Sequence, residues 1–147
     1  MKVIKANFAD AIDIFKWRND RAAILYSVSK KKIQLSKHKK WFEKNLVNSK
    51  NKIYIGLVTL KKRMYKIGMV RFDQKKKIVN VSINLNPKFR GMNLSKKFLK
   101  MSIKKFNTKK SLFAKIRKEN KRSINCFSSC GFILFKTQKQ FMIFKKI

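Results

Sequence analysis

The sequence lacks any long uninterrupted run of apolar residues. No stretch approaches the roughly 20 residues that a membrane-spanning helix needs, so we expect no membrane span. Near the N-terminus, Lys5, Asp10 and Asp13 interrupt the apolar core that a signal peptide requires. Hydrophobic residues still make up 44% of the 147 residues, which is too many for a disordered chain and enough for a two-layer core. We therefore expect a soluble, cytoplasmic protein with a single domain over residues 1–147.

Acidic residues are also scarce. Six carboxylates face 40 Lys and Arg residues, and the formal net charge is +34 at pH 7. Such a charge favours an anionic partner, which could be nucleic acid, a membrane surface or a phosphorylated ligand. An AT-rich genome would produce the same bias, because Lys, Asn, Ile and Phe are abundant while Pro occurs once and Gly 4 times. We favour this compositional explanation and expect nucleic acid to bind only non-specifically.

Cysteine and histidine are too few for a zinc site. Cys126 and Cys130 are four residues apart on one face of an expected helix, and His38 is the only histidine. No second cysteine pair completes a set of zinc ligands. We expect buried, reduced thiols and no metal ion.

Apolar periodicity divides the chain into strands and helices. A strand at 3–4 precedes helices at 8–19 and 36–46, with Ser36 as the cap of the second and an irregular segment at 20–35 between them. Strands follow at 53–60, 65–72 and 78–85, the first two joined as a hairpin. A helix at 94–106, a strand at 112–116 and a helix at 121–130 precede a closing hairpin at 133–135 and 141–144. This order predicts an α/β (α+β) fold, with helices on both faces of a central, mostly antiparallel mixed sheet of about seven strands.

Residues 85–97 form the first segment with functional character. A strand ends there, a short basic loop contains Arg90 and Gly91, and a helix begins near Leu94 or Ser95. Backbone N–H groups at a helix start have no partner within the helix and lie at the positive end of its dipole, so they can bind phosphate. An ordinary strand–turn–helix connection with surface lysines would show the same pattern.

Residues 119–132 form the second such segment, which follows a strand and opens a helix. Asn120 can bond a neighbouring backbone group through its amide, and Ser123 lies in the first turn. Phe127 and Cys130 share one face, and Gly131 ends the helix. A plain amphipathic helix with a glycine stop is the alternative.

The order and spacing of the two segments resemble the GNAT acetyltransferases. In that family a bulged strand leads to a pyrophosphate-binding loop of the form R/Q-x-x-G-x-G/A, here Arg90 to Ser95, and a later Asn precedes a helix ending in Gly-Phe, here Asn120 to Phe132. The resemblance implies direct transfer of an acetyl group from acetyl-CoA to an amine, without a covalent enzyme intermediate or a metal. The implied contacts to acetyl-CoA are Ile83, Leu85, Arg90, Gly91, Met92, Asn93, Leu94, Ser95, Lys96, Asn120, Ser123 and Phe127.

This chain departs from the family pattern at three positions. Asn93 and Ser95 replace loop glycines, but Asn tolerates left-handed geometry and Ser begins helices well, so we expect the loop to bind phosphate. Phe127 stands where many members carry a tyrosine that protonates the leaving thiolate, and it cannot supply a proton. For catalysis the resemblance implies a backbone N–H from Leu85 on the thioester oxygen, and His38 is the best side-chain candidate for a base.

The N-terminal half carries a narrower resemblance. FKWRNDR at 15–21, HKKWF at 38–42 and Arg71-Phe72-Asp73 are similar to GNAT enzymes that acetylate amino sugars on nucleotide carriers, of the pseudaminic acid pathway type. The implied partner is a small molecule, a nucleotide-linked amino sugar, and the resemblance allows a homodimer. The implied acceptor contacts are Trp17, Arg18, Asn19, Arg21, His38, Trp41 and Arg71, although Trp17, Trp41 and His38 also fit structural positions.

Three other functions fit the sequence. Ribosomal-protein and peptide N-terminal acetyltransferases share part of the N-terminal pattern. A basic nucleic-acid-associated protein without catalysis would explain the charge, but the aromatic residues have the spacing of core positions and no RNA-binding motif is present. A GNAT fold can also serve only as a scaffold. The scarcity of carboxylates favours an anionic acceptor over a cationic one.

Overall fold

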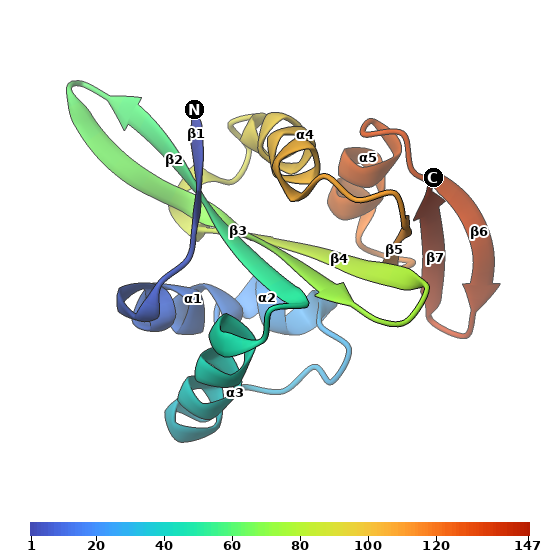
Figure 1. The fold of residues 1–147 in the computed structure, drawn as a ribbon, viewed down its shortest axis with the longest axis horizontal. Helices are drawn as coiled ribbons and strands as arrows, with labels where there is room; N and C mark the ends of the chain where they lie inside the picture. Colours follow the sequence, from blue (N-terminus) through green and yellow to red (C-terminus); the bar gives the residue numbers. More distant parts are fainter.

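The computed structural model describes residues 1–147 and contains one sheet of seven strands (Figure 1). The strands are β1 (Lys2–Lys5), β2 (Asn51–Leu60), β3 (Arg63–Gln74), β4 (Ile78–Leu85), β5 (Ser111–Arg117), β6 (Ile133–Gln138) and β7 (Phe141–Lys146). Their order across the sheet is β1-β2-β3-β4-β5-β7-β6, and every neighbouring pair is antiparallel except β4 and β5. The predicted α/β class with a mostly antiparallel mixed sheet is confirmed.

Helices cover both faces of this sheet (Figure 1). One face carries the 3-10 helix η1 (Phe8–Asp10), α1 (Ala11–Arg18), α2 (Arg21–Tyr26) and α3 (Leu35–Val47); the other carries α4 (Leu94–Phe106) and α5 (Lys121–Ser128). A cluster of 6 buried residues, which includes Trp17 and Phe42, fills the first interface. A cluster of 19, which includes Phe98 and Phe127, fills the second. No helix is long and apolar enough to cross a membrane.

Every predicted helix and strand is present, and several boundaries differ. Strands β3, β6 and β7 are longer than predicted, α5 ends at Ser128 rather than at 130, and the α1–α3 face departs most. The helix predicted from residue 8 begins with the tighter turn of η1, and the irregular segment at 20–35 contains the short helix α2. The prediction that Ser36 caps α3 is wrong. This helix begins at Leu35 and Gln34 is its N-cap, without a side-chain hydrogen bond, so Ser36 already lies inside the first turn. Gly131 has the left-handed φ of +85° that suits a glycine after a helix, but α5 ends at Ser128 with Ser129 as its C-cap, so Gly131 lies one position beyond the predicted C′.

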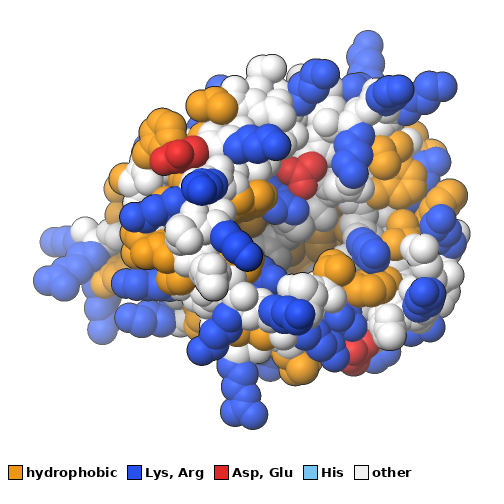
Figure 2. Space-filling view, turned by 90° about the horizontal axis from the view of Figure 1, so that it is seen from below, with side chains coloured by type: hydrophobic (Ala, Val, Ile, Leu, Met, Phe, Trp, Pro, Cys, Tyr) orange, Lys and Arg blue, Asp and Glu red, His pale blue; other side chains and the backbone are white.

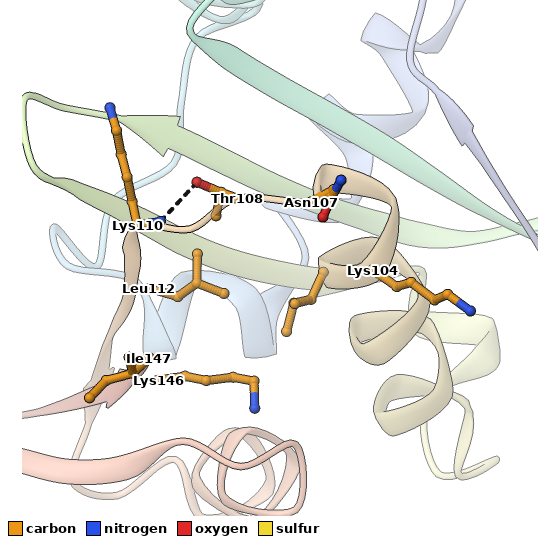
Figure 3. A pocket seen from close by; sticks show the side chains of 8 residues that line it. Lys104, Asn107, Thr108, Lys110, Leu112, Lys146 and Ile147 are labelled. Atoms are coloured by element: carbon orange, nitrogen blue, oxygen red, sulfur yellow. Dashed lines mark hydrogen bonds between the residues drawn. The ribbon is translucent and has the colours of Figure 1, made fainter.

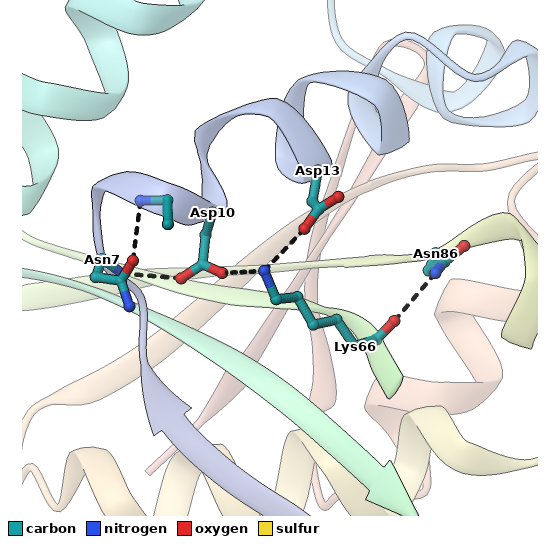
Figure 4. A network of polar contacts seen from close by, with 6 residues as sticks. Asn7, Asp10, Asp13, Lys66 and Asn86 are labelled. Carbon is teal, nitrogen blue, oxygen red and sulfur yellow. Dashed lines mark hydrogen bonds and ion pairs between the residues drawn. The ribbon is translucent and has the colours of Figure 1, made fainter. Parts of the chain in front are cut away.

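An ion-pair network joins the α1–α3 face to the sheet. Lys66 Nζ on β3 lies 2.7 Å from Asp10 Oδ1 and 2.8 Å from Asp13 Oδ2, while the Lys66 carbonyl accepts a hydrogen bond from Asn86 (Figure 4). Asp10 also accepts a hydrogen bond from the N–H of Asn7, which completes the cap of η1. Since Asp10 is buried, the Lys66 charge provides the compensation that a carboxylate in that position needs.

The parallel strands β4 and β5 separate soon after they meet. Only residues 78–80 of β4 pair with residues 111–113 of β5, whereas β4 stays paired with β3 as far as Leu85. A 3-10 turn, η2 (Pro87–Phe89), then leads to α4, so the start of α4 lies at the open end of the gap. Separation of two strands leaves backbone groups without the partners that a sheet normally supplies. The gap is therefore a place where a ligand can receive backbone hydrogen bonds.

Candidate active site

The open half of β4 presents backbone N–H groups to this gap. The N–H of Asn86 donates to the carbonyl of Ile67 on β3 at 2.9 Å. Because successive residues of a strand direct their N–H groups to opposite sides, those of Leu85 and Ile83 point away from β3. The Leu85 carbonyl shows the same direction, since it accepts a hydrogen bond from Arg90 Nη2 at 3.1 Å. The N–H expected to serve as a donor at Leu85 therefore faces the gap.

Two left-handed residues shape the loop before α4. Gly91 has φ of +79°, and Asn93 has φ of +55° and ψ of +24°, the geometry for which Asn was expected to replace Gly. The Asn93 side chain makes no capping hydrogen bond, so the first N–H groups of α4 keep their capacity to donate. No protein atom lies within 4 Å of the place where a Cβ on Gly91 would be. The loop is thus exposed, and its N–H groups at the start of α4 are open to an anion such as phosphate.

Arg90 is engaged within the protein. Its Nη1 pairs with Asp20 at the start of α2, and its Nη2 bonds the Leu85 carbonyl. Burial opposes ionisation of Asp20, but the hydrogen bond from Arg90 and those from the backbone of Ala22 and Ala23 lower the pKa of this carboxyl overall. Arg90 therefore braces the loop against α2. The free donors of the loop are its backbone N–H groups and the exposed lysines that follow them.

The segment 119–132 begins as the sequence predicted, with Asn120 at the start of α5. Near its end, Phe127 has a packing role that was not predicted. Asn120 caps α5, because its side-chain oxygen accepts a hydrogen bond from the N–H of Ser123 at 3.2 Å. Phe127 is buried in the larger core and meets Phe132 edge-on, with ring centroids 5.0 Å apart. A contact between Phe127 and acetyl-CoA stays a prediction, and the structure gives this residue a packing role in addition.

The two cysteines connect α5 to the start of α4. Both are free and buried, as predicted. Cys130 Sγ lies 3.6 Å from the carbonyl oxygen of Lys96 in the first turn of α4. The adjacent Cys126 thiol lowers the pKa of Cys130 to about 7 through a hydrogen bond, against the effect of burial. The thiols thus support the helix start from the core side.

Two arginines lie close together on the α1–α3 face, beside the open half of β4. Arg71 is opposite Ser82 of β4, its guanidinium lies 5.2 Å from the ring centre of Trp41, and its Nε is 2.9 Å from Asp73 Oδ2. That ion pair lacks the alignment of a hydrogen bond, so Arg71 Nε is buried without a hydrogen-bond partner. Arg18 Nη1, at the end of α1, is buried without a partner too. Burial and then the positive charge of Arg71 lower the pKa of Arg18.

This arginine pair fits an anion. Buried N–H groups of guanidinium are rarely left unpaired in folded proteins, and two like charges held together repel each other. A carboxylate or phosphate would accept hydrogen bonds from both groups and remove the repulsion. The structure therefore brings together Arg18, Trp41 and Arg71 among the residues that were expected to bind the acceptor.

Sequence reasoning missed a row of polar side chains on β4. Val79 and Val81 belong to the larger core, so the alternate residues Asn80, Ser82 and Asn84 face the α1–α3 side, next to Arg71. All three are half-buried. The signal was present as strict polar–apolar alternation from 79 to 85, which is normally read as a strand with one face toward solvent. In this fold that face forms the floor beside the arginine pair.

Three other residues expected at the acceptor lie elsewhere or serve the fold. Trp17 is buried in the smaller core. The Asn19 side chain bonds both the N–H and the carbonyl of Ile33 at 2.8 Å, which fastens the end of α1 to the segment before α3. Arg21 is exposed on α2, and its side chain makes no hydrogen bond or ion pair. Their roles in acceptor binding stay predictions.

His38 lies between α3 and α1. It is only 2% exposed, and its ring packs against Phe15, Trp41 and Phe42. Its Nε2 lies 2.8 Å from the carbonyl oxygen of Ala11, so Nε2 must carry the proton. Burial lowers the pKa of His38, against the effect of this hydrogen bond. These contacts favour the structural role over that of a base, for which His38 stays a prediction.

A hollow lies on the α1–α3 face, which is also the face of Arg18, Trp41 and Arg71. Seen from the α1–α3 side, Figure 2 shows a depression near the middle of the face, bordered largely by Lys and Arg side chains. A cavity of about 250 Å³ lies away from it, between the end of α4, the start of β5 and the C-terminus, and is lined by residues such as Lys104, Asn107 and Lys146 (Figure 3). That cavity involves neither the loop before α4 nor the arginine pair. The structure holds no cluster of three side chains able to bind a metal.

Comparison with known families decides the class of the protein. Residues 3–133 match the family described as "Acetyltransferase (GNAT) domain". The chain belongs to the GNAT acetyltransferase family. It is an acetyl-CoA-dependent N-acetyltransferase, as the segments 85–97 and 119–132 predicted, with acetyl-CoA as co-substrate. No curated protein sequence matches the chain.

Solved structures of other proteins have the same fold. A domain from Methanocaldococcus jannaschii matches with a TM-score of 0.85 at 18% identity, over 99% of this chain and 96% of the other. The ribosomal-protein-alanine N-acetyltransferase of Brucella melitensis gives 0.78 at 15% identity, over 100% and 99%. The spermidine N-acetyltransferase of Vibrio cholerae, in complex with CoA and spermine, gives 0.78 at 12% identity, over 98% and 92%. At these identities the likeness establishes the fold and leaves the acceptor to the residues of the site.

Proposed function

We propose that this GNAT enzyme acetylates the amino group of an anionic, hydroxylated acceptor, and that a nucleotide-linked amino sugar is the acceptor. The observation that carries the proposal is the pair Arg18 and Arg71. Both side chains are half-buried, and their buried atoms Arg18 Nη1 and Arg71 Nε have no hydrogen-bond partner, although Arg71 Nε has an ion pair with Asp73. A diphosphate satisfies such a pair, because guanidinium groups bind phosphate oxygens in a bidentate manner. The adjacent Trp41 and the polar row on β4 suit a sugar or nucleobase ring and its hydroxyl groups.

The co-substrate is expected at the other side of the gap. The N–H groups at the start of α4 would hold its pyrophosphate, and the N–H of Leu85 would donate to the thioester oxygen as negative charge develops there. The neutral acceptor amine attacks the thioester carbonyl carbon, the carbon–sulfur bond breaks, and CoA leaves as the thiolate. The nitrogen releases one proton to the thiolate or to water, which gives the amide. Most of the acceleration in this arrangement comes from holding the two substrates in line.

The carboxylates of this chain argue against a polycationic acceptor. Five of the six are already ion-paired: Asp10 and Asp13 with Lys66, Asp20 with Arg90, Asp73 with Arg71, and Glu119 with Lys30. A polyamine or the ammonium of a cationic peptide would find no free carboxylate beside the arginine pair and would be repelled by it. Acetylation of protein N-termini is the second candidate, favoured by the likeness in size and fold to the Brucella melitensis enzyme.

Steady-state kinetics of arginine variants test the proposal. We expect Arg18→Ala and Arg71→Ala to raise KM for a UDP- or dTDP-linked amino sugar about tenfold to 100-fold, since a hydrogen bond to a charged group contributes about 1.5–3 kcal/mol. KM for acetyl-CoA should stay unchanged in both. Arg63→Ala removes an exposed arginine from the β2–β3 hairpin and provides the matched control. The proposal is wrong if the two variants change only KM for acetyl-CoA, or if peptides alone are acetylated.

A further inference from the structure

One face of the C-terminal half of the sheet combines aromatic and basic side chains. The face belongs to β5, β7 and β6, and we call it the aromatic–basic face; its residues are Phe113, Lys115, Phe135, Lys136, Phe141 and Lys145. The spacing of the aromatic residues predicted core positions, and for Phe135 that prediction is wrong, because its side chain is 55% exposed. Single exposed apolar residues are normal, but Phe135 lies beside a second ring, Phe113, and among lysines, and surface rings gathered in this way mark an interaction site.

The strand register places these residues on one side of the sheet. Phe113 is opposite Lys145, and Lys115 is opposite Ile143, in the β5–β7 ladder. The alternate residues of β5, Leu112 and Ala114, are buried in the core shared with α4 and α5, so Phe113 and Lys115 point to the other side. A register shift between Leu134 and Lys136 lets Phe135 reach Phe113, edge-on, with centroids 5.5 Å apart. The figures agree, since orange and blue side chains alternate in Figure 2 at the side where β6 and β7 lie in Figure 1.

Cations lie directly over the rings. Lys115 Nζ is 4.3 Å from the ring centre of Phe141, and Lys145 Nζ is 5.8 Å from that of Phe113 and 5.6 Å from that of Phe135. The face includes no carboxylate; Glu119, beyond the end of β5, pairs with Lys30. Lys145 is the only cation over Phe113 and Phe135, and it is a flexible side chain that can move aside. Phe141 is also covered by Arg117, whose Cζ lies 4.8 Å from the ring centre and which is buried and bonds the carbonyls of Ser27 and Val28.

We propose that the aromatic–basic face binds single-stranded nucleic acid. Unpaired bases stack on exposed rings, and the lysines between the rings contact the phosphates that join those bases. The exposed ring of Phe135, with the half-buried ring of Phe113 edge-on beside it, gives a platform for about one or two bases, without selection of sequence. A duplex would not fit this chemistry, because its bases are already stacked on one another. The proposal is independent of the acceptor that the enzyme acetylates.

Net charge alone would not produce this site. Lysines cover the whole molecule and would attract any nucleic acid, single or double, to many places. The aromatic–basic face differs because rings and cations alternate on it within stacking distance, and because rings contribute to single strands only. Removal of a ring leaves the charge intact, so binding by the rings and binding by the charge can be separated.

Fluorescence anisotropy with a labelled oligo(U) and a DNA duplex of equal length tests the proposal. We expect Phe135→Ala to weaken oligo(U) binding by at least about fivefold and to leave duplex binding unchanged, since stacking contributes about 1–3 kcal/mol per base. The salt slope of oligo(U) binding should not change, because no charge is lost, whereas Lys145→Ala should reduce it by about 0.7. Phe135→Trp should retain oligo(U) binding.

Two control variants show whether the loss of binding is specific to the aromatic–basic face. Phe8→Ala removes a ring that is 61% exposed on η1, and Lys39→Ala removes an exposed lysine from α3. Both should leave oligo(U) binding within about twofold of the wild type. The proposal is overturned if Phe135→Ala behaves as Phe8→Ala does, or if oligo(U) and duplex bind with equal affinity and equal salt slope, since charge alone would then account for binding. Circular dichroism of each variant verifies that it is folded.

Discussion

Gly91 and Asn93 determine whether the loop before α4 can receive a phosphate. Both have a left-handed backbone; Gly91 has no side chain, and the Asn93 side chain makes no hydrogen bond to the start of α4. The Arg90 side chain, by contrast, holds the loop in place through Asp20 and the Leu85 carbonyl. We therefore propose that the backbone of this loop binds the pyrophosphate and that the Arg90 side chain secures the backbone.

Replacement of Gly91 tests whether the backbone of this loop binds the pyrophosphate of CoA. Gly91→Val places a β-branched residue at φ of +79°, a strain of about 1–2 kcal/mol, and fills the space that a phosphate would use. We expect CoA affinity, measured by calorimetry, to fall about tenfold or more. Gly131→Val is the control, because Gly131 has φ of +85° but lies at the end of α5. It should lose stability and keep CoA affinity; equal affinities in both variants would place the pyrophosphate elsewhere.

His38 makes the stability of the protein depend on pH. Burial lowers the pKa of His38 in the folded state, so the folded ring stays neutral when the unfolded ring takes up a proton below about pH 6.5. The stabilising contribution is complete above that pH and is lost as the pH falls from about 6.5 toward the lowered folded-state value.

Urea denaturation at pH 7.5 and 5.5 measures this effect. The wild type should lose more stability between the two pH values than His38→Gln, which can still donate a hydrogen bond to the Ala11 carbonyl but does not titrate. The kcat of His38→Gln at saturating substrates should stay within about threefold of the wild type, since a base normally contributes about 100-fold or more. A folded variant with a collapsed kcat would instead identify His38 as the catalytic base.

At the scale of elements, α1 and η1 are fastened to β3 by one lysine. Lys66→Met would leave Asp10 as a buried carboxylate, with its side chain 3% exposed and without a cation. Loss of one partner of a buried ion pair costs about 3–5 kcal/mol, and partial exposure of Lys66 reduces our expectation to about 2 kcal/mol of unfolding free energy. The measurement is chemical denaturation, with exposed Lys39→Met as control. If Asp10→Asn in the Lys66→Met background recovers no stability, the ion pair is not the cause.

The elements were largely predictable, because each carries a local signal. Residues 78–85 and 94–106 match β4 and α4, since the apolar spacing changes there from a period of two to that of a helix. The start of α3 was misplaced by its serine, because several polar residues near a helix start are equally good caps and tertiary packing decides among them. The separation of β4 from β5 after Asn80 could not be predicted from the local sequence, because it depends on which residues of two distant strands pair.

The candidate site was predictable at positions where the residue type alone indicates the chemistry. Arg18 and Arg71 stood out as arginines among many lysines, and in the fold they are near enough for the charge of Arg71 to lower the pKa of Arg18. The polar row Asn80, Ser82 and Asn84 could not be distinguished from an ordinary solvent face, because which side of β4 borders the arginines depends on the packing of α1 and α3. Phe135 was misjudged for the same reason: spacing along a strand gives its face but does not say whether a helix covers that face.

At the scale of the whole molecule, the net charge of +34 acts on every ligand. A field of this sign attracts anionic acceptors and acetyl-CoA and repels cations, and salt screens both effects over about 10 Å at 0.1 M. Whatever the genomic origin of the lysines, this field biases the choice of acceptor in the same direction as the arginine pair. The positive field and the arginine pair therefore both predict that an anionic acceptor is preferred.

The measurement that tests the central claim most directly is the salt dependence of acetyl transfer to acceptors of opposite charge. CoA release is followed at 20–300 mM KCl with UDP- or dTDP-linked amino sugars, with cationic N-terminal peptides and with spermidine. The account predicts that an amino-sugar nucleotide has the highest kcat/KM, by at least about tenfold, and that its kcat/KM falls as salt rises. Preferred turnover of spermidine or a cationic peptide, with kcat/KM insensitive to salt or rising with it, would contradict the account.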